Sequence, residues 1–271
     1  MNPELVFYSA SSLLESPVWS ERHQSIFCVS IDDCLIYQIQ TNGFVKTFKT
    51  AGPVGCVVVN ENGDLVSAEK EGVFLYCLES GSKKFINHFE ANNQMRYNDG
   101  KLDPRGRFLV GTKGWKEEYL DRGNLYSYNG EQVKVIIDKI GISNGIGFNS
   151  DGSKMYFIDT ITKKVALYNY CLDSGDASFE RYIIEIPGSG YPDGMCVDID
   201  NNLWVAEWEG GKVCKWDPHS GLKLAQIYLP CDRVTSCCLG GQNLEYLYIT
   251  TARNPQKMEQ MAGGLFKIKL R

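Results

Sequence analysis

Four polar side chains stand at matching places in the sequence, each at the entrance to a short apolar run. They are Glu15, Asn98, Asn144 and Asp193, and the last three are 46 and 49 residues apart. Carboxylate and amide oxygens are the ligands that hard divalent cations such as Ca²⁺, Mg²⁺ and Mn²⁺ prefer. The lack of His and Cys among them is not typical of zinc, although zinc stays possible. We predict that these four side chains hold one divalent cation, provided that the fold brings them together.

A simpler explanation exists for each position alone. Asn144-Gly145 and Asp193-Gly194 are ordinary turn dipeptides, because these residues tolerate a positive φ. Glu15 needs no such turn, however, and a turn preference does not explain why four such residues recur at corresponding positions. The shared register therefore favours a common site.

A repeated two-strand pattern must position these residues. A polar turn followed by an apolar strand recurs six times, and the spacing between the copies runs from 39 to 48 residues; the first apolar residues are Ile26, Leu65, Phe108, Met155, Leu203 and Leu247. A period in the forties, with about four strands in each period, is typical of a β-propeller. We therefore expect an all-β, six-bladed β-propeller that forms a single domain over residues 1–271. The innermost strands would line a central channel that contains the metal site, and the segment 4–8 would join the last blade.

Composition narrows the range of functions. Apolar residues make up 43% of the 271 residues and aromatic residues 12%, which is enough for a packed core. The formal net charge of −5, without a basic cluster, argues against nucleic-acid binding. No apolar run approaches the roughly 18 residues of a membrane span, and the start of the chain lacks the pattern of a signal peptide. We expect a cytoplasmic protein without membrane or nucleic-acid partners, either a monomer or a weak homo-oligomer.

The cysteines and histidines do not indicate a zinc site. The ten cysteines include no Cys-x-x-Cys pair, and the three histidines lie far apart. Most of the cysteines fall inside apolar strands, where small buried thiols are common. We expect them to be reduced and structural.

Several motifs together resemble the SMP-30/gluconolactonase/regucalcin-like family. The resemblance runs from about Glu15 to Leu270, and it rests on Glu15-Ser16-Pro17-Val18-Trp19, Arg96-Tyr97-Asn98-Asp99-Gly100-Lys101, Asp103-Pro104-Arg105-Gly106-Arg107, Gly111-Thr112, Ser143-Asn144-Gly145 and Pro192-Asp193-Gly194-Met195. It implies a six-bladed propeller with a divalent metal ion in the channel, and in many members the hydrolysis of sugar lactones. It also implies that Glu15, Asn144 and Asp193 are metal ligands. Arg96 and Asn98 would contact the substrate, with Asn98 at or near the metal.

The sequence departs from the family pattern at three places, one of which is the first-blade strand Cys28-Val29-Ser30, where the family usually has Trp-Val-Asp. Leu14 and Ser16 flank Glu15, where the family usually has glycines. The loop after Gly111-Thr112 carries a substrate-contacting acidic residue in some members. Here that loop offers Glu117, with Glu118 as the alternative in an ambiguous register. These departures leave the metal site intact and bear on which lactone fits.

The predicted reaction is metal-assisted opening of a sugar lactone. The cation, Ca²⁺ by expectation and Mg²⁺, Mn²⁺ or Zn²⁺ as alternatives, would polarise the carbonyl while Asp193 takes a proton from the attacking water. Arg96 would hold sugar hydroxyls or the carbonyl oxygen. Two alternatives stay open: a non-catalytic calcium-binding regulatory propeller, and a related metal-dependent esterase or phosphotriesterase. A serine nucleophile at Ser143 is disfavoured, because its Gly-x-Ser-x-Gly sequence lacks the strand–turn–helix context.

Overall fold

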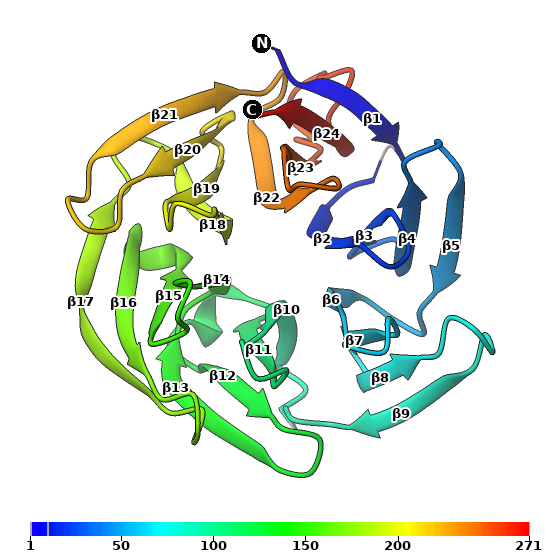
Figure 1. Cartoon of the computed structure of the whole chain (residues 1–271), viewed down its shortest axis with the longest axis vertical. Coiled ribbons are helices and arrows are strands. Elements are labelled where there is room, and N and C mark those ends of the chain that lie inside the picture. The colour runs from blue at the N-terminus through cyan, green and yellow to red at the C-terminus, as the bar shows by residue number, and fades with distance from the viewer. Residues whose placement is uncertain (1, 10, 91, 271) are drawn as a thin grey trace.

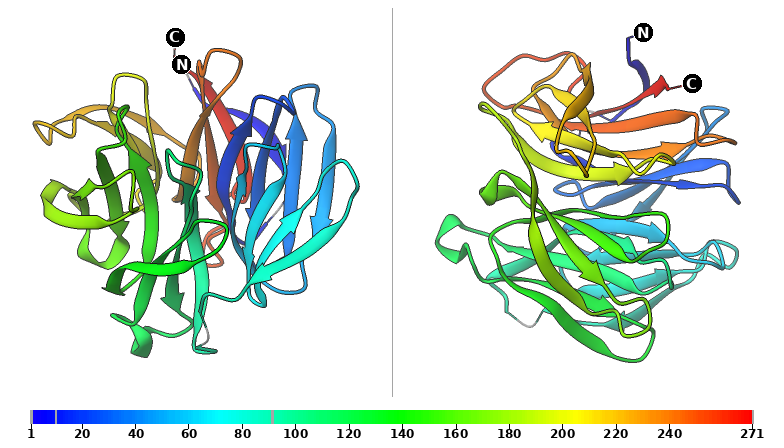
Figure 2. Two further views of the ribbon diagram at one scale, coloured as in Figure 1. Left: turned by 60° about the horizontal axis from the view of Figure 1, so that its bottom comes forward. Right: turned by 60° about the vertical axis from the view of Figure 1, so that its left-hand side comes forward.

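In the part of the chain that the structure describes, twenty-four strands form six antiparallel sheets of four strands each, arranged in a ring around a central axis (Figure 1). The computed structural model describes residues 2–9, 11–90 and 92–270. Figure 2 shows from two further sides that the sheets stand next to one another around one axis. The predicted all-β, six-bladed propeller is confirmed.

The strands fall into four concentric sets, one strand of each set in every blade. The innermost strands are β2 (Leu14–Ser20), β6 (Val54–Val59), β10 (Met95–Leu102), β14 (Ser143–Phe148), β18 (Tyr191–Val197) and β22 (Arg233–Gly240). The second strands are β3 (Ser25–Ser30), β7 (Leu65–Glu69), β11 (Phe108–Gly114), β15 (Lys154–Asp159), β19 (Leu203–Trp208) and β23 (Tyr246–Ala252). We number the blades 1 to 6 by these innermost strands, from β2 to β22.

The third and fourth sets complete each blade towards the circumference. The third strands are β4 (Leu35–Gln40), β8 (Gly72–Tyr76), β12 (Gly123–Tyr128), β16 (Lys164–Tyr170), β20 (Lys212–Trp216) and β24 (Gly264–Lys269). The outer strands are β5 (Val45–Lys49), β9 (Lys83–Asn87), β13 (Val133–Ile140), β17 (Ala177–Glu185), β21 (Lys223–Tyr228) and β1 (Glu4–Tyr8). Two single-turn 3₁₀ helices, η1 (Glu117–Tyr119) and η2 (Thr160–Thr162), interrupt this pattern.

The ring closes by joining its two ends in one blade. Strand β1 pairs antiparallel with β24, and Glu4 lies opposite Lys267. The expectation that the N-terminal strand completes the last blade is therefore correct. Because this pairing links the first and last strands of the chain, it holds the ring shut by ladder hydrogen bonds.

The repeated polar turns connect the first and second strands of a blade. In blade 3, Asp103 Oδ1 accepts hydrogen bonds from two backbone N–H groups of its own turn, and Asp198 Oδ1 does the same in blade 5. Gly106 and Asn201 occupy the corresponding left-handed positions, at φ 79° and 61°. Asn and Gly tolerate this conformation at little cost, which explains why the pattern recurs.

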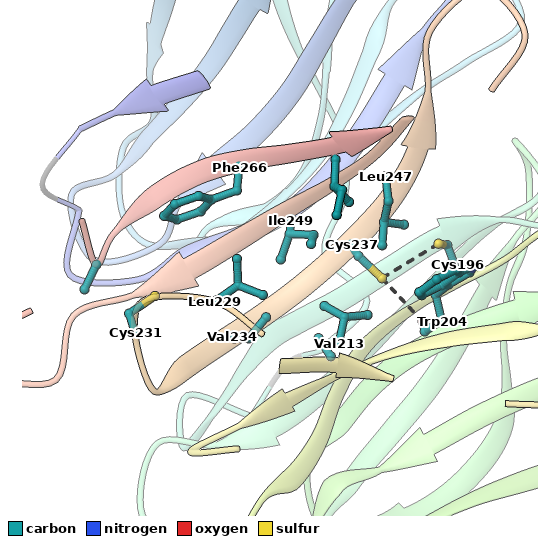
Figure 3. Close-up of a cluster of buried hydrophobic side chains, with 13 residues drawn as sticks. Cys196, Trp204, Val213, Leu229, Cys231, Val234, Cys237, Leu247, Ile249 and Phe266 are labelled. Carbon is teal, nitrogen blue, oxygen red and sulfur yellow. Dashed lines mark hydrogen bonds between the residues drawn. The ribbon is translucent and has the colours of Figure 1, made fainter. Parts of the chain in front are cut away.

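The hydrophobic core is divided among the contacts between neighbouring blades. Among the described residues, six clusters of buried apolar side chains occur, one at each blade interface. Figure 3 shows the cluster between blades 5 and 6, where Trp204 and Val213 face Leu247 and Phe266. Burying each such side chain contributes about 1.5–3 kcal/mol, so the interfaces hold the blades in fixed relative positions.

All ten cysteines are free, and most are buried between strands. Cys171 is an exception to the predicted burial, because it follows β16 in an exposed turn. Within residues 2–9, 11–90 and 92–270 there is no helix of the length and apolarity that a bilayer crossing requires.

Candidate functional site

Every innermost strand is irregular near its beginning. In each blade the register between the first and second strands shifts at this point, as a β-bulge does. In three blades the first residue left unpaired by the shift is a predicted site residue, Asn98, Asn144 or Asp193. A bulge bends the strand and re-aims a side chain that would otherwise lie against the neighbouring blade. The bulges therefore direct these side chains towards one end of the channel.

Glu15 reaches the same end of the channel from a slightly different position. It pairs with Val29, and the register shift follows it at Ser16 and Pro17. Glu15 thus stands one residue earlier in its bulge than the three residues above, so the equivalence predicted from the sequence is wrong by one position. Ser16 takes the left-handed conformation, at φ 51°, and its N–H donates to Glu15 Oε2 at 2.7 Å.

A chain of hydrogen bonds joins the polar residues of blades 3, 4 and 5. Asn98 Nδ2 donates to Asn144 Oδ1 at 2.9 Å and to the carbonyl oxygen of Ser143 at 2.8 Å. Asn144 Nδ2 in turn donates to Thr160 Oγ1 at 2.7 Å, and that hydroxyl donates to the carbonyl oxygen of Pro192 at 2.8 Å. These bonds fix the amide plane of Asn144 and leave part of the accepting capacity of its oxygen free.

Close contact between the innermost strands brings blades 4 and 5 together at this end. A Cβ at Gly145 would lie 2.9 Å from the carbonyl oxygen of Asp193. Only glycine allows the two backbones to approach this closely. The Asn-Gly dipeptide of β14 therefore serves the packing of the site, which a turn preference alone does not explain.

Two carboxylates are buried at this end of the channel, and a third, that of the half-buried Asp99, lies within electrostatic reach of both. Burial, and then the negative charges of Asp193 and Asp99, raise the pKa of Glu15 well above its usual value. Burial, and then Asp99, raise the pKa of Asp193 in the same way, and burial also raises the pKa of Asp99. Glu15 and Asp193 are only 8% and 7% exposed. The site therefore concentrates negative charge where water screens it poorly.

Two cations lie beside these carboxylates. Burial lowers the pKa of Arg96, and burial together with the charge of Arg96 lowers the pKa of Lys113 to about 8. The negative charges of Asp193 and Glu15 act in the opposite direction and raise the pKa of both Arg96 and Lys113. Arg96 Nη1 donates to the carbonyl oxygen of Tyr97 at 2.9 Å. The predicted substrate contact Arg96 thus lies within electrostatic reach of the predicted ligands.

Glu117 and Glu118 lie in the exposed helix η1, beyond the end of β11. Glu118 forms an ion pair with Lys116 at 3.9 Å, where both side chains are largely exposed. No interaction among the described residues links Glu117 to the buried carboxylates or to Arg96, so its role in substrate binding stays a prediction. Lys113 is the residue after Gly111-Thr112 that the structure places among the site charges.

Sequence reasoning missed Asp99, Lys113 and Thr160. Asp99 was visible as the neighbour of Asn98, but only its burial beside Glu15 and Asp193 distinguishes it from a turn residue. Lys113 could be found only from the strand register, which sets it opposite Arg96. Thr160 belongs to η2, and no repeat position predicted it.

Ser143 has none of the features of a nucleophile. It is fully buried, and its hydroxyl has no hydrogen-bond partner among the described residues. A Cβ at Gly111 would lie 1.7 Å from that hydroxyl, so the second strand of blade 3 packs directly against Ser143. The resemblance of its surroundings to a Gly-x-Ser-x-Gly motif is accidental.

The donor set suits a hard cation. The carboxylates of Glu15 and Asp193 are both buried, burial and the charge of Asp193 raise the pKa of Glu15, and a divalent ion would compensate their negative charge. Over the described residues, however, no group of three or more His, Cys, Asp or Glu side chains is arranged to hold a metal. A metal ion would therefore depend on the amide oxygens of Asn144 and Asn98, and its binding stays a prediction.

The far end of the channel contains a separate cavity of about 460 Å³. All six innermost strands line it; Asp99 reaches it from the bulge of β10, and Lys101 contributes a cation. Glu15, Asn144 and Asp193 do not line this cavity. They form the opposite end of the channel, at the beginnings of the innermost strands.

Comparison with known proteins agrees with this fold. A regucalcin from Pongo abelii is 34% identical over 283 residues, covering 94% of this chain and 89% of the relative. The structure of a calcium-binding regucalcin from Agrobacterium tumefaciens has a TM-score of 0.92 at 21% identity, covering 99% of this chain and 93% of the other. A gluconolactonase from Xanthomonas campestris has a TM-score of 0.81 at 19% identity, covering 98% and 89%.

Fold and site together define a six-bladed β-propeller with an acidic, amide-lined site at one end of its channel. The model of the SMP-30/gluconolactonase/LRE-like region matches residues 13–253. The chain belongs to this family, as the resemblance in its motifs implied. The family includes gluconolactonases as well as regucalcins, which leaves the activity of this member to be argued from its own residues.

Proposed function

We propose that this chain is a divalent-metal-dependent hydrolase that opens sugar lactones. The observation that carries the proposal is the burial of Glu15 and Asp193 together, with raised pKa values, beside the amides of Asn144 and Asn98. Such a group is unfavourable unless a cation occupies it. The cationic side chain of Arg96 beside it offers a second point of attachment for an oxygen-rich substrate.

The residues that would hold the ion are Glu15, Asn144 and Asp193, with Asn98 as a fourth oxygen donor or as the residue that orients Asn144. When bound, a divalent cation, Ca²⁺ foremost, supplies Lewis-acid polarisation of the lactone carbonyl and stabilises negative charge on its oxygen. The bond from Asn98 to Asn144 keeps the amide of Asn144 in one orientation before any ligand arrives. Such preorganisation avoids a cost of reordering when the ligand binds.

Asp193 is proposed as the general base. Its buried carboxylate could accept a proton from a water held in the site. It would take one proton from the attacking water as the oxygen bonds to the carbonyl carbon. The bond between that carbon and the ring oxygen then breaks, and the ring oxygen takes up the proton that Asp193 accepted and becomes a hydroxyl. The product is the open-chain sugar acid.

Arg96 is proposed to bind substrate oxygens. Its guanidinium uses one N–H for the carbonyl oxygen of Tyr97, which leaves further N–H groups for hydroxyl or carbonyl oxygens. The ring of Trp115 lies 5.7 Å from the guanidinium and is 42% exposed. A planar aromatic beside a guanidinium is a suitable wall for a sugar ring.

The test is hydrolysis of a panel of aldonolactones by protein stripped of metal and then loaded with Ca²⁺, Mg²⁺, Mn²⁺ or Zn²⁺. We expect turnover to require a metal, and Glu15→Gln and Asp193→Asn to lower kcat/KM by about 100-fold or more. Matched controls are Glu79→Gln and Asp138→Asn, because both carboxylates are exposed away from the channel. Full activity in Asp193→Asn would exclude Asp193 as the base.

A second candidate function is calcium binding without catalysis. The regucalcin relatives favour it, because a solved regucalcin is described as a calcium-binding protein. The same buried carboxylates and amides would then serve only to hold the ion. Tight Ca²⁺ binding that is lost in Glu15→Gln, without turnover of any lactone, ester or phosphotriester, would establish this candidate in place of the hydrolase.

A further inference from the structure

Two cations lie directly opposite one another at the mouth of the channel. Arg96 in β10 and Lys113 in β11 are cross-strand partners in blade 3. Directly opposed residues of an antiparallel pair project their side chains from the same face, and like charges in this arrangement repel. The mutual effect is visible in Lys113, whose pKa the charge of Arg96 lowers in addition to burial. This arrangement is unfavourable unless something negative stabilises it.

The carboxylates around the pair do not neutralise it by direct contact. Asp193, Asp32 and Glu15 all act on Lys113, but only through their fields, and the described residues provide no hydrogen-bond or ion-pair partner for its ammonium group. Asp32 is exposed and accepts a hydrogen bond from Ser12 at 3.0 Å. Glu15 and Asp193 are the predicted ligands of a divalent ion, so their charge would be taken up by that ion. Lys113 is left as a half-buried cation without a direct partner.

Neither cation can withdraw easily from this position. The guanidinium of Arg96 is held by the carbonyl oxygen of Tyr97 and by the ring of Trp115. The backbone of Lys113 is fixed in two directions, by its pairing with Arg96 and by an isolated bridge to Ile142 of blade 4. With a divalent ion present, its two charges and those of Arg96 and Lys113 would outnumber the three carboxylates of Glu15, Asp99 and Asp193. The mouth of the site would then attract an anion.

We propose that the substrate is a sugar lactone that carries an additional anionic group, held by Lys113 and Arg96. The proposal rests on the proposed lactonase function and names the class of lactone. The anion is a phosphate or a second carboxylate at the end of the sugar remote from the scissile carbonyl. Both groups present oxygens that a guanidinium and an ammonium bind by charge-assisted hydrogen bonds. Because this group takes no part in bond breaking, its binding acts chiefly on KM.

The experiment compares three lactones with metal-loaded protein: 6-phosphoglucono-1,5-lactone, glucaro-1,4-lactone and neutral glucono-1,5-lactone. We expect Lys113→Met to lower kcat/KM for one or both anionic lactones by about tenfold or more, relative to the neutral one. Lys113→Arg, which keeps the charge, is expected to restore most of the difference. The matched control is Lys84→Met, because Lys84 is exposed on the outer strand β9 (Figure 1). The two anionic lactones separate phosphate from carboxylate recognition.

Salt gives an independent measurement on the unaltered protein. At about 1 M salt the Debye length falls to roughly 3 Å, so the KM of an anionic lactone should rise while the KM of the neutral lactone changes little. An equal response of all three lactones to both salt and Lys113→Met would overturn the proposal.

A binding measurement separates this proposal from the proposed function. Calorimetric titration with 6-phosphogluconate and with gluconate needs no turnover. Binding of 6-phosphogluconate that weakens about tenfold in Lys113→Met would support the anion site, even if no lactone were hydrolysed. Equal affinity of wild type and Lys113→Met for 6-phosphogluconate would refute the anion site, even in an active lactonase.

Discussion

Asn98 Nδ2 lies 2.9 Å from Asn144 Oδ1, and this hydrogen bond joins the innermost strands of blades 3 and 4. The same amide also donates to the backbone of Ser143, so Asn98 holds both the side chain and the strand that carry one predicted ligand. Asn144 is in turn fixed by Thr160. The orientation of an amide that could serve a cation is thus determined by a neighbouring blade.

The first prediction concerns this bond. Asn98→Ala removes both hydrogen bonds and should lower the free energy of unfolding by about 1–2 kcal/mol. It should also weaken divalent-metal binding by about 10- to 100-fold, whether Asn98 is itself a ligand or orients Asn144. Asn169→Ala is the control, since that side chain pairs with Lys154 on the exposed side of blade 4. Equal metal affinity of the two variants in calorimetry would show that Asn98 has no part in the site.

The second prediction is that neutral replacements of the ligands stabilise the metal-free protein. Because the pKa of Glu15 is raised on folding, its contribution to stability is complete below about pH 4 and is lost as the pH rises through the raised value. Glu15→Gln and Asp193→Asn avoid this loss. At pH 7 without metal, the free energy of unfolding of each variant should exceed that of wild type by on the order of 1 kcal/mol, which corresponds to a Tm higher by about 2–4 °C.

When metal is added, the order of stability should reverse, so that the same two variants become less stable than wild type. Wild-type Tm should rise with Ca²⁺, by an amount equivalent to about 2.7 kcal/mol at a concentration of 100 Kd, and the variants should respond weakly. Differential scanning fluorimetry at pH 4 and pH 7, with chelator and with Ca²⁺, measures the Tm of wild type and of both variants under each condition. Variants that are less stable than wild type in chelator at pH 7 would contradict the electrostatic account.

The third prediction concerns Ser16, which stands where the family usually has glycine. Its left-handed backbone costs roughly 1–2 kcal/mol for a residue with a Cβ. Its hydroxyl offsets this cost, because it accepts from Val57 N at 3.1 Å and donates to Val57 O at 3.3 Å. Ser16→Ala keeps the strain and loses both bonds, so it should lower the free energy of unfolding by about 1–3 kcal/mol. Ser16→Gly loses both bonds but also removes the strain. Its free energy of unfolding, measured by chemical denaturation, should therefore be about 1–2 kcal/mol higher than that of Ser16→Ala. Identical stabilities of Ala and Gly at this position would argue against backbone strain.

The fourth prediction assigns a structural role to the motif Asp103-Pro104-Arg105-Gly106-Arg107. The fully buried carboxylate of Asp103 accepts from Arg107 Nε and from the hydroxyl of Tyr170 in blade 4, each at 2.6 Å. Asp103→Asn leaves Arg107 without its counter-charge and should lower the free energy of unfolding by about 2–4 kcal/mol. Urea denaturation beside the exposed control Asp138→Asn measures this loss. Metal affinity at temperatures where the variant is folded should stay near that of wild type, and a large fall in affinity would place Asp103 in the functional site instead.

The fold could be predicted from the sequence because its determinants are local. Turn residues such as Asp103 and Asn201 end one strand and begin the next, and the alternation of apolar residues gives each strand its faces. Six copies of this pattern leave few arrangements other than a ring in which each blade covers the next. The pairing of β1 with β24 followed from the same need to cover the last blade.

The residue types of the candidate site were also visible in the sequence, since Glu15, Asn98, Asn144 and Asp193 recur with the blades. Their arrangement was not, because Glu15 and Asp193 are 178 positions apart and meet only when the ring closes. The one-residue offset of Glu15 within its bulge is an example of an arrangement that the sequence did not reveal. A bulge is a relation between two paired strands, so one strand's sequence does not reveal where the pairing slips.

The sequence by itself determined the all-β repeat, the number of blades and the oxygen-rich chemistry at the beginnings of the innermost strands, since alternation, turn chemistry and side-chain type are properties of short segments. Only the tertiary structure decided which charges share a buried space. Asp99 acts on Glu15 and Asp193 because burial removes the water that would screen it, and Lys113 faces Arg96 because two strands pair in one register. Burial and strand register arise from contacts between distant segments, and the electrostatics of the site follow from them.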